Sequence, residues 1–229
     1  MRSVQDISVQ GKRVFVRVDY NLPMNDQGRI TDDNRIRQTL DLIQYLMEKQ
    51  AKIILASHLG RPKGGYEKRF SLAPVADHLS GLLGKEVAFA SDCIGPDVSD
   101  QVAALKNGDI LLLENLRFHK QEKANDDAFA RQLAGLCDVY VNNAFAVSHR
   151  DQASVTGIVA HVPVAAAGFL LEREMNAFAD AFESPERPLV AVIGGAKVSG
   201  KLAALENLLN TVDQMIIGGA MANTFLFSQ

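Results

Sequence analysis

The chain of 229 residues carries a formal net charge of −3, and 47% of its residues are hydrophobic. This composition is that of a globular protein and excludes intrinsic disorder, while the small net charge gives no indication of nucleic-acid or membrane binding. The length allows one large domain, or one domain with part of another, and any anion site must be a local concentration of arginine and lysine.

The termini and the cysteines point to a cytoplasmic protein. The first residues lead into no long apolar segment, so no signal peptide is predicted, and no apolar run approaches membrane-spanning length. Cys93 and Cys137 lie far apart and form no metal-ligand spacing, so we expect two reduced thiols rather than a disulfide.

The chain opens with a strand and a helix. Residues 13–18 alternate polar and apolar side chains, which indicates a strand that ends before residues 19–23. Residues 31–34 offer N-cap side chains for a helix whose apolar positions are Ile36, Leu40, Ile43 and Met47. Arg35 then lies in the first helical turn, which suits a residue that meets an anion there.

Three further apolar strands are each followed by a loop that carries arginine. Strand 51–56 precedes the loop Ser57-His58-Leu59-Gly60-Arg61-Pro62, strand 109–114 precedes Arg117, and strand 138–142 precedes Arg150. The remaining predicted elements are a short strand at 86–90 and helices at 72–79, 98–105 and 126–136.

Because strands and helices alternate, we expect a parallel sheet in a three-layer α/β/α, Rossmann-like domain. Ligands of such sheets bind beyond the carboxyl ends of the strands, here near residues 18, 56, 114 and 142. The polar residues that follow these ends are Asp19, Asn21, Arg35, His58, Arg61, Arg117 and Arg150. Each arginine alone could be a solvated surface residue, but four at one topological position favour a pocket for a small dianion.

The second part of the chain begins with a long amphipathic helix at 169–182, which the Pro-containing segment 183–188 ends. Strands are predicted at 189–193 and 214–217, with a helix through Leu202, Leu205 and Leu209 between them. We therefore predict an N-terminal domain at 1–168, an interdomain helix and hinge at 169–185, and an incomplete second α/β domain at 186–229.

A glycine-rich turn follows the strand at 189–193. Residues 195–201 match G-x-x-x-x-G-K, but Leu202 stands where a Walker A motif has Ser or Thr, so a P-loop NTPase is disfavoured. Two interpretations stay open: Lys197 and Lys201 approach a phosphate from one side of a helix start, or they are solvated lysines on a structural turn.

Taken in order, five motifs resemble phosphoglycerate kinases. They are Val16-Arg17-Val18-Asp19-Tyr20-Asn21-Leu22-Pro23, Ser57-His58-Leu59-Gly60-Arg61-Pro62, Glu114-Asn115-Leu116-Arg117-Phe118, Ala144-Phe145 with His149-Arg150, and Gly194-Gly195-Ala196-Lys197-Val198 with Lys201. The resemblance implies a two-domain glycolytic enzyme, monomeric when full length, that reversibly transfers a phosphoryl group from 1,3-bisphosphoglycerate to ADP. The products are 3-phosphoglycerate and ATP, and Mg²⁺ accompanies the nucleotide.

The resemblance also implies a role for each matching residue. Asp19 and Asn21 should hold the hydroxyl and carboxyl end of the substrate. The groups that grip the phosphate that is not transferred should be His58, Arg61, Arg117 and Arg150. Arg35 and Lys197 should be catalytic and face the moving phosphoryl group. The nucleotide should be contacted by Lys197 and Lys201 and approached by the backbone at Gly194, Gly195, Gly218 and Gly219.

The chain departs from the family pattern in two ways. Asn143 and Ala146 stand where the family usually has Asp and Gly, and most of the nucleotide domain, with the residues expected to serve Mg²⁺, is absent. We therefore expect substrate binding with little or no turnover from this chain alone. The alternatives are a non-catalytic phosphate- or anion-binding module, and an oligomer formed through the apolar strand at 214–217.

Overall fold

The computed structural model describes residues 1–25, 27–183, 185–195 and 202–228 of the chain. The chain divides into two compact units, Met1–Arg173 and Glu174–Gln229. None of the described helices is both long and apolar enough to cross a membrane.

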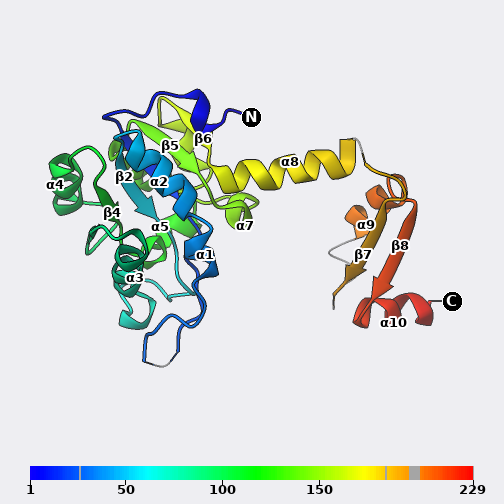
Figure 1. The fold of residues 1–229 in the computed structure, drawn as a ribbon. Coiled ribbons are helices and arrows are strands. Elements are labelled where there is room, and N and C mark those ends of the chain that lie inside the picture. Colours follow the sequence, from blue (N-terminus) through cyan, green and yellow to red (C-terminus); the bar gives the residue numbers. More distant parts are fainter. Residues whose placement is uncertain (26, 184, 196–201, 229) are drawn as a thin grey trace. The chain divides into compact units, whose positions relative to one another are not determined.

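The first unit contains a six-stranded sheet in the order β3-β4-β2-β1-β5-β6, in which every neighbouring pair of strands is parallel (Figure 1). The strands are β1 (Arg13–Arg17), β2 (Lys52–Ala56), β3 (Val87–Phe89), β4 (Ile110–Leu112), β5 (Val139–Asn142) and β6 (Ala165–Ala167). The predicted parallel sheet is therefore confirmed, and the four strands expected to lead into polar loops are direct neighbours.

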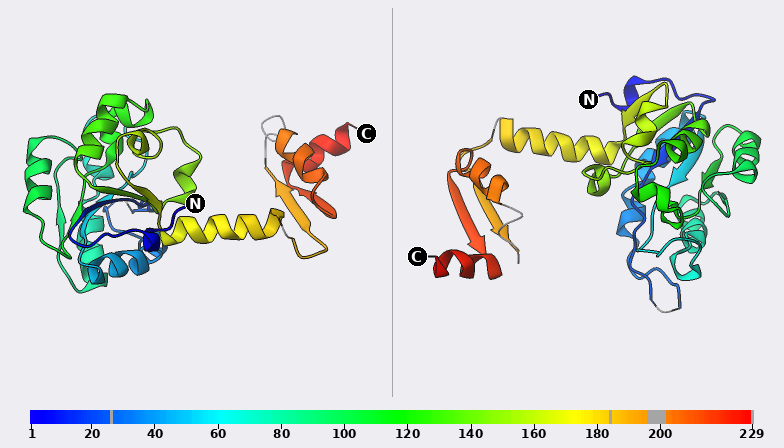
Figure 2. Two further views of the ribbon diagram at one scale, coloured as in Figure 1. Left: turned by 90° about the horizontal axis from the view of Figure 1, so that it is seen from above. Right: turned by 180° about the vertical axis from the view of Figure 1, so that it is seen from behind.

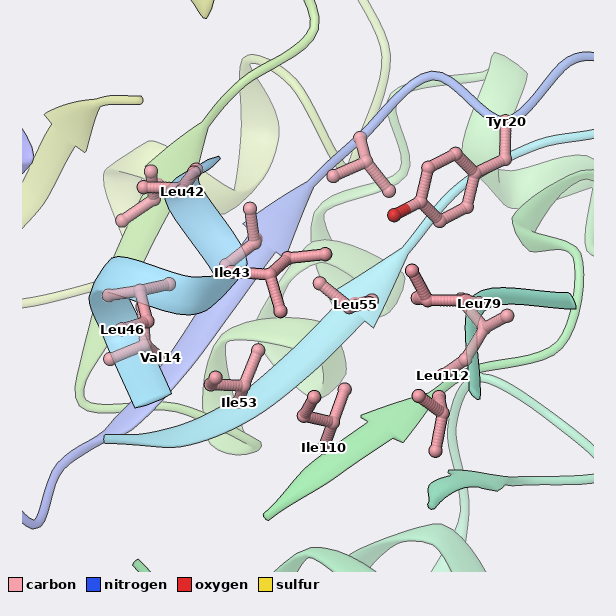
Figure 3. Close-up of a cluster of buried hydrophobic side chains, with 14 of the residues drawn as sticks. Val14, Tyr20, Leu42, Ile43, Leu46, Ile53, Leu55, Leu79, Ile110 and Leu112 are labelled. Carbon is pink, nitrogen blue, oxygen red and sulfur yellow. The ribbon is translucent and has the colours of Figure 1, made fainter. Parts of the chain in front are cut away.

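Both faces of this sheet are buried, because successive side chains of each strand enter different cores. In β1, Val14 and Val16 belong to one apolar cluster and Phe15 to the other. Figure 3 shows the first cluster, where Leu42 and Leu46 lie over the β1 and β2 side chains. A sheet covered on both faces needs strands of nearly continuous apolar sequence, which is what β2, β4 and β5 contain.

Helices complete the three predicted layers (Figures 1 and 2). One core includes side chains of α1 (Asn34–Arg37), α2 (Leu40–Glu48) and α3 (Ala73–Leu83). The opposite core includes side chains of α4 (Pro96–Ala104) and α6 (Asp127–Gly135). The short helices are α5 (Lys120–Lys123), α7 (Phe145–Ser148) and the 3-10 turns η1 (Val4–Asp6), η2 (Lys68–Phe70), η3 (Leu116–Phe118) and η4 (Gly157–Ala160).

One local prediction was wrong in detail, and one strand was missed. The helix expected across Ile36 to Met47 is divided into α1 and α2, and Thr39 at the break turns its hydroxyl back to the Ile36 carbonyl at 2.7 Å. Strand β6 was not predicted, since its three residues are alanines, which have a low preference for strands.

The second unit holds a parallel pair, β7 (Val190–Gly194) and β8 (Gln214–Gly218), with α9 (Leu202–Leu209) between them in sequence and α10 (Ala220–Phe227) after them. The two strands and α9 were predicted, whereas α10 was not. Helix α8 (Phe169–Glu183) contains the division between the units. The finer assignment of 169–185 as a hinge stays a prediction.

Candidate active site

The polar loops predicted from the sequence gather at one edge of the sheet. Strands β4, β2, β1 and β5 are consecutive and parallel, so their carboxyl ends point the same way. The residues placed there by these strands and the segments after them are Asp19, Asn21, Arg35, His58, Arg61, Arg117 and Arg150. The structure thus brings the predicted substrate residues to a common edge, which we call the basic cluster.

The loop after β2 is held at Gly60 from both sides. The Gly60 N–H donates to Asn21 Oδ1 at 2.8 Å, and the Gly60 carbonyl accepts from Arg117 Nη1 at 2.9 Å. Gly60 has a φ of +62°, and a Cβ added to it would lie 2.3 Å from the Phe70 ring. Glycine is therefore required by backbone conformation and by space, and three loops meet at this residue.

A second set of contacts, made by Asn115 and Glu114, also holds the loop after β2. Asn115 Nδ2 donates to the Leu59 and Phe70 carbonyls at 2.8 and 2.9 Å, while its Oδ1 caps the turn that contains Arg117. The neighbouring Glu114 carboxylate accepts from the Ser71 hydroxyl at 2.7 Å. The loops that carry Arg61 and Arg117 are consequently ordered before any ligand binds.

His58 is a neutral group at the base of the basic cluster. Its side chain is only 2% exposed and its Nδ1 lies 3.2 Å from Nη2 of Arg17. Burial, followed by the charges of Arg17, Arg117, Arg150 and Arg35, lowers the pKa of His58 to about 2. His58 can therefore offer a hydrogen bond to an anion, but it adds no positive charge at neutral pH.

Arg117 is the most deeply placed arginine of the predicted substrate set. It is 7% exposed, and burial together with Arg150 and Arg17 lowers its pKa to about 10. Its Nε is buried and has no hydrogen-bond partner among the described residues. A buried cationic donor without a partner is costly, and an anion bound at this position would satisfy it.

The remaining cations are more accessible. Arg35, in the first turn of α1, forms a close ion pair with Asp19 while its side chain is 47% exposed. Arg61 is exposed and Arg150 is partly exposed. The cluster therefore combines fixed groups at its base with solvent-facing arginines at its rim, an arrangement suited to a ligand that carries phosphate and carboxylate groups.

A cavity of about 780 Å³ adjoins the basic cluster: its wall includes Asn21 of the cluster and Gly60, to which Arg117 donates a hydrogen bond. Its wall also includes Phe70 and two further cationic residues, Lys68 and Arg69. None of the four predicted phosphate-binding side chains lines this cavity. The four predicted phosphate-binding side chains therefore lie outside this cavity.

The predicted nucleotide glycines lie together in the second unit. Gly194 and Gly218 are register partners at the ends of β7 and β8, and each is followed by another predicted glycine, Gly195 and Gly219. A Cβ on Gly194 would lie 3.4 Å from the Gly218 carbonyl oxygen. Lys197 and Lys201 fall outside the described residues, so their predicted roles stay predictions.

A magnesium site is not apparent in the described part of the chain. The group there whose ligand atoms lie close enough for a metal is Asp92, Cys93 and His119, all within 4.8 Å of one another. Mg²⁺ prefers oxygen ligands, so a set with a thiol and an imidazole does not fit it. We therefore derive no step through a metal held by these residues.

Three buried polar residues next to the basic cluster were missed by the sequence prediction: Arg17, Glu122 and Ser154. Arg17 and Glu122 are fully buried and are joined through the Ser154 hydroxyl. Arg17 was predicted only as part of a strand of alternating polar and apolar residues, and no prediction was made for Glu122 or Ser154. The available signal was that Arg17 lies in a strand expected to be buried on both faces.

Comparison with known proteins decides the family. The phosphoglycerate kinase family model matches residues 4–229. The chain belongs to the phosphoglycerate kinase family. The phosphoglycerate kinase of Desulforapulum autotrophicum is 62% identical over 229 residues, which cover all of this chain and 59% of that relative. That of Desulfotalea psychrophila is 57% identical, with 58% of its length covered.

Solved phosphoglycerate kinase structures have the same fold. The enzyme from Coxiella burnetii superposes with a TM-score of 0.88 at 46% identity, covering 99% of this chain and 57% of that one. The enzyme from Pyrococcus horikoshii OT3 gives a TM-score of 0.87 at 35% identity, covering 100% and 57%. The chain thus spans somewhat more than half the length of these phosphoglycerate kinases.

The structure shows what surrounds Asn143, one of the positions at which the sequence departs from the family pattern. Asn143 is fully buried, and its Oδ1 accepts from the Leu170 N–H at the start of α8 at 2.8 Å. Its Nδ2 has no hydrogen-bond partner among the described residues. The Asn143 side chain thus satisfies one backbone N–H at the start of α8 without placing a negative charge in the interior.

Proposed function

We propose that this chain is the glycerate-binding part, with the beginning of the nucleotide-binding part, of a phosphoglycerate kinase. The complete enzyme would transfer a phosphoryl group reversibly between 1,3-bisphosphoglycerate and ADP. The observation that carries the proposal is the convergence of four neighbouring strand ends on the basic cluster. A compact set of cations on ordered loops is what recognition of a phosphorylated carboxylic acid requires.

The phosphate that stays on the substrate would bind at the base of the cluster. Arg117 supplies a buried donor that lacks a partner within the described part of the chain, and neutral His58 supplies a hydrogen bond. Arg61 and Arg150 reach this phosphate from the rim. Because fixed loops hold these groups, little ordering is needed when the ligand binds.

The transferred phosphoryl group would pass on the side of Arg35. Asp19 holds Arg35 in the free protein, and the same carboxylate can accept the substrate hydroxyl beside Asn21. Phosphoryl transfer depends on alignment and charge neutralisation more than on a covalent catalyst. We propose that Arg35, with Lys197 from residues 186–229, neutralises the charge of the moving group.

The nucleotide would bind against the glycines that follow β7 and β8, whose lack of side chains permits close backbone approach. Lys201 would meet the nucleotide phosphates, and Mg²⁺ would arrive with ADP or ATP. We propose residues 1–168 as the substrate domain and 169–185 as the hinge. Turnover would then need the part of the family's length that this chain does not span.

Calorimetric titration of the 229-residue chain with 3-phosphoglycerate tests substrate recognition. We expect saturable binding that Arg61→Ala weakens and that Arg131→Ala leaves unchanged, since Arg131 pairs with Asp127 on α6. Inorganic phosphate serves as the competitor. Equal affinity for phosphate and 3-phosphoglycerate would instead support a non-catalytic anion-binding module.

Complementation tests the catalytic part. The chain is mixed with a separately produced C-terminal part of a related phosphoglycerate kinase, and ATP consumption that depends on 3-phosphoglycerate is measured. We expect activity from the mixture and little from either part alone. No recovery with both parts folded would contradict the proposed function.

A further inference from the structure

A buried chain of hydrogen bonds runs behind the basic cluster. Arg17 Nε donates to the Ser154 hydroxyl at 2.9 Å, and that hydroxyl donates to Glu122 Oε1 at 2.6 Å. Arg17, Ser154 and Glu122 are all fully buried. The chain therefore joins a cation of β1 to a carboxylate of α5 through a single hydroxyl.

The far end of this chain reaches His58. Arg17 Nη2 lies 3.2 Å from His58 Nδ1, and Nη1 donates to the Val18 carbonyl. A guanidinium can only donate hydrogen bonds, so Nδ1 must be the acceptor in this contact. The proton of the neutral imidazole is thereby assigned to Nε2.

Glu122 also holds the segment that follows Arg150. Its Oε2 accepts from the Ser154 N–H at 3.0 Å, and its backbone carbonyl accepts from the Ala153 N–H at 3.0 Å. These contacts lie within four residues of Arg150. The Glu122 carboxylate is thus connected both to His58 and to the segment that follows Arg150.

We propose that Glu122, acting through Ser154 and Arg17, is a positioning residue that fixes His58 as the Nε2–H tautomer and anchors the Arg150 segment. This inference rests on the proposed function, because it names what holds two of the groups assigned to the substrate phosphate. No residue of this network is assigned to the substrate itself.

The charge balance of the region supports this role. After burial, the charges that lower the pKa of His58 are those of Arg17, Arg117, Arg150 and Arg35, all of them cations. For Arg17, burial lowers the pKa, while Glu122 is the foremost of the groups that raise it. Glu122 therefore compensates a buried cation whose donors are needed at His58 and Ser154.

The tautomer can be measured without ligand, by nitrogen-15 NMR of the imidazole in the full 229-residue chain at neutral pH. We expect a single Nε2–H form in the unaltered protein. Ser154→Ala removes only the hydroxyl that links Arg17 to Glu122, and we expect a second tautomer to appear. Ser80→Ala is the matched control, since the Ser80 hydroxyl, like that of Ser154, donates one hydrogen bond and accepts another, but its partners are the Ala76 carbonyl and the Val87 N–H.

Binding is the second readout. We expect Ser154→Ala to weaken 3-phosphoglycerate binding by about tenfold, the effect of losing roughly one hydrogen bond's worth of positioning. Ser80→Ala should bind as the unaltered chain does. Failure of the unaltered chain to bind 3-phosphoglycerate would refute the proposed function, while the tautomer measurement would still test the network.

A charge-balanced variant guards against misfolding. Arg17→Met with Glu122→Gln removes both buried charges together, so no unpaired charge is left inside. We expect a mixed tautomer and weakened binding here as well. A single Nε2–H form with unchanged affinity in the folded variants would overturn the proposal, and weakened binding with an unchanged tautomer would overturn its His58 part.

Discussion

Replacing Gly60 by alanine should destabilise the first unit and loosen the basic cluster. The left-handed backbone at φ +62° costs an alanine about 1–2 kcal/mol, and displacing the Phe70 ring adds about 1–3 kcal/mol. We expect a total loss of about 2–5 kcal/mol in the free energy of unfolding. Binding of 3-phosphoglycerate should weaken too, because Asn21 and Arg117 both hydrogen-bond to Gly60.

Gly28→Ala separates the two contributions. Gly28 has a φ of +73°, but a Cβ there would meet nothing within 4 Å. Alanine at Gly28 should therefore cost only the backbone part, about 1–2 kcal/mol. The difference between the two variants, about 1–3 kcal/mol, measures the contact with Phe70.

Urea unfolding followed by tyrosine fluorescence is a suitable assay. The chain has four tyrosines and no tryptophan, and every tyrosine lies within Met1–Arg173, so the signal reports on the first unit alone. Gly60→Ala should give a lower midpoint than Gly28→Ala. Equal midpoints would refute the steric argument, and a destabilised variant with unchanged ligand affinity would refute the role of Gly60 in holding the cluster.

Four further predictions rest on exposure and charge. Arg61→Ala should weaken 3-phosphoglycerate binding in calorimetry by about 10- to 150-fold, and it should leave the urea midpoint unchanged because the side chain is exposed. Arg35→Ala should mainly lower turnover in the complemented enzyme. Hydrogen bonding from Arg13 lowers the pKa of Asp138. The pair therefore stabilises the fold above the unfolded pKa of about 3.9, and this stabilisation is lost as the pH falls through the folded pKa. Asp138→Asn should reduce the dependence of the free energy of unfolding on acidic pH by about 0.2–1 kcal/mol, because the pair is half-exposed. Cys93 and Cys137 are free, buried thiols with raised pKa values, so Ellman's reagent at pH 8 should label them only after unfolding; labelling of the native chain would contradict this.

The strands that carry the site were predictable because each satisfies one simple condition. Strands β2, β4 and β5 lie between helices on both sides, so their sequences are continuously apolar and short. Parallel order then sends their loops to one edge without further information. Strand β6 could not be predicted in this way, since its three alanines pair with β5 through the backbone while their side chains contribute little apolar area.

The residues of the candidate site also divide into those that could be predicted from the sequence and those that could not. Arg61, Arg117 and Arg150 follow strand ends and could be predicted from topology. The buried network of Arg17, Ser154 and Glu122 could not, because it depends on a contact between residues 137 positions apart, Arg17 and Ser154. The strand around Arg17 gave a signal of burial, but nothing local did so for Glu122, since a charged residue in a short helix is usually exposed.

The basic cluster also shows why so many of its neighbours are fixed by hydrogen bonds. Several cations held together repel one another, and burial, followed by the charges of neighbouring arginines, lowers the pKa values of His58 and Arg117. The contacts of Gly60 with Arg117 and of Ser154 with Arg17 hold these two cations in place against that repulsion. The apolar sheet thus supplies stability, and the neutral and acidic residues beneath the edge supply geometry. Arg117 keeps a buried Nε donor that has no partner among the described residues and that a bound anion would satisfy.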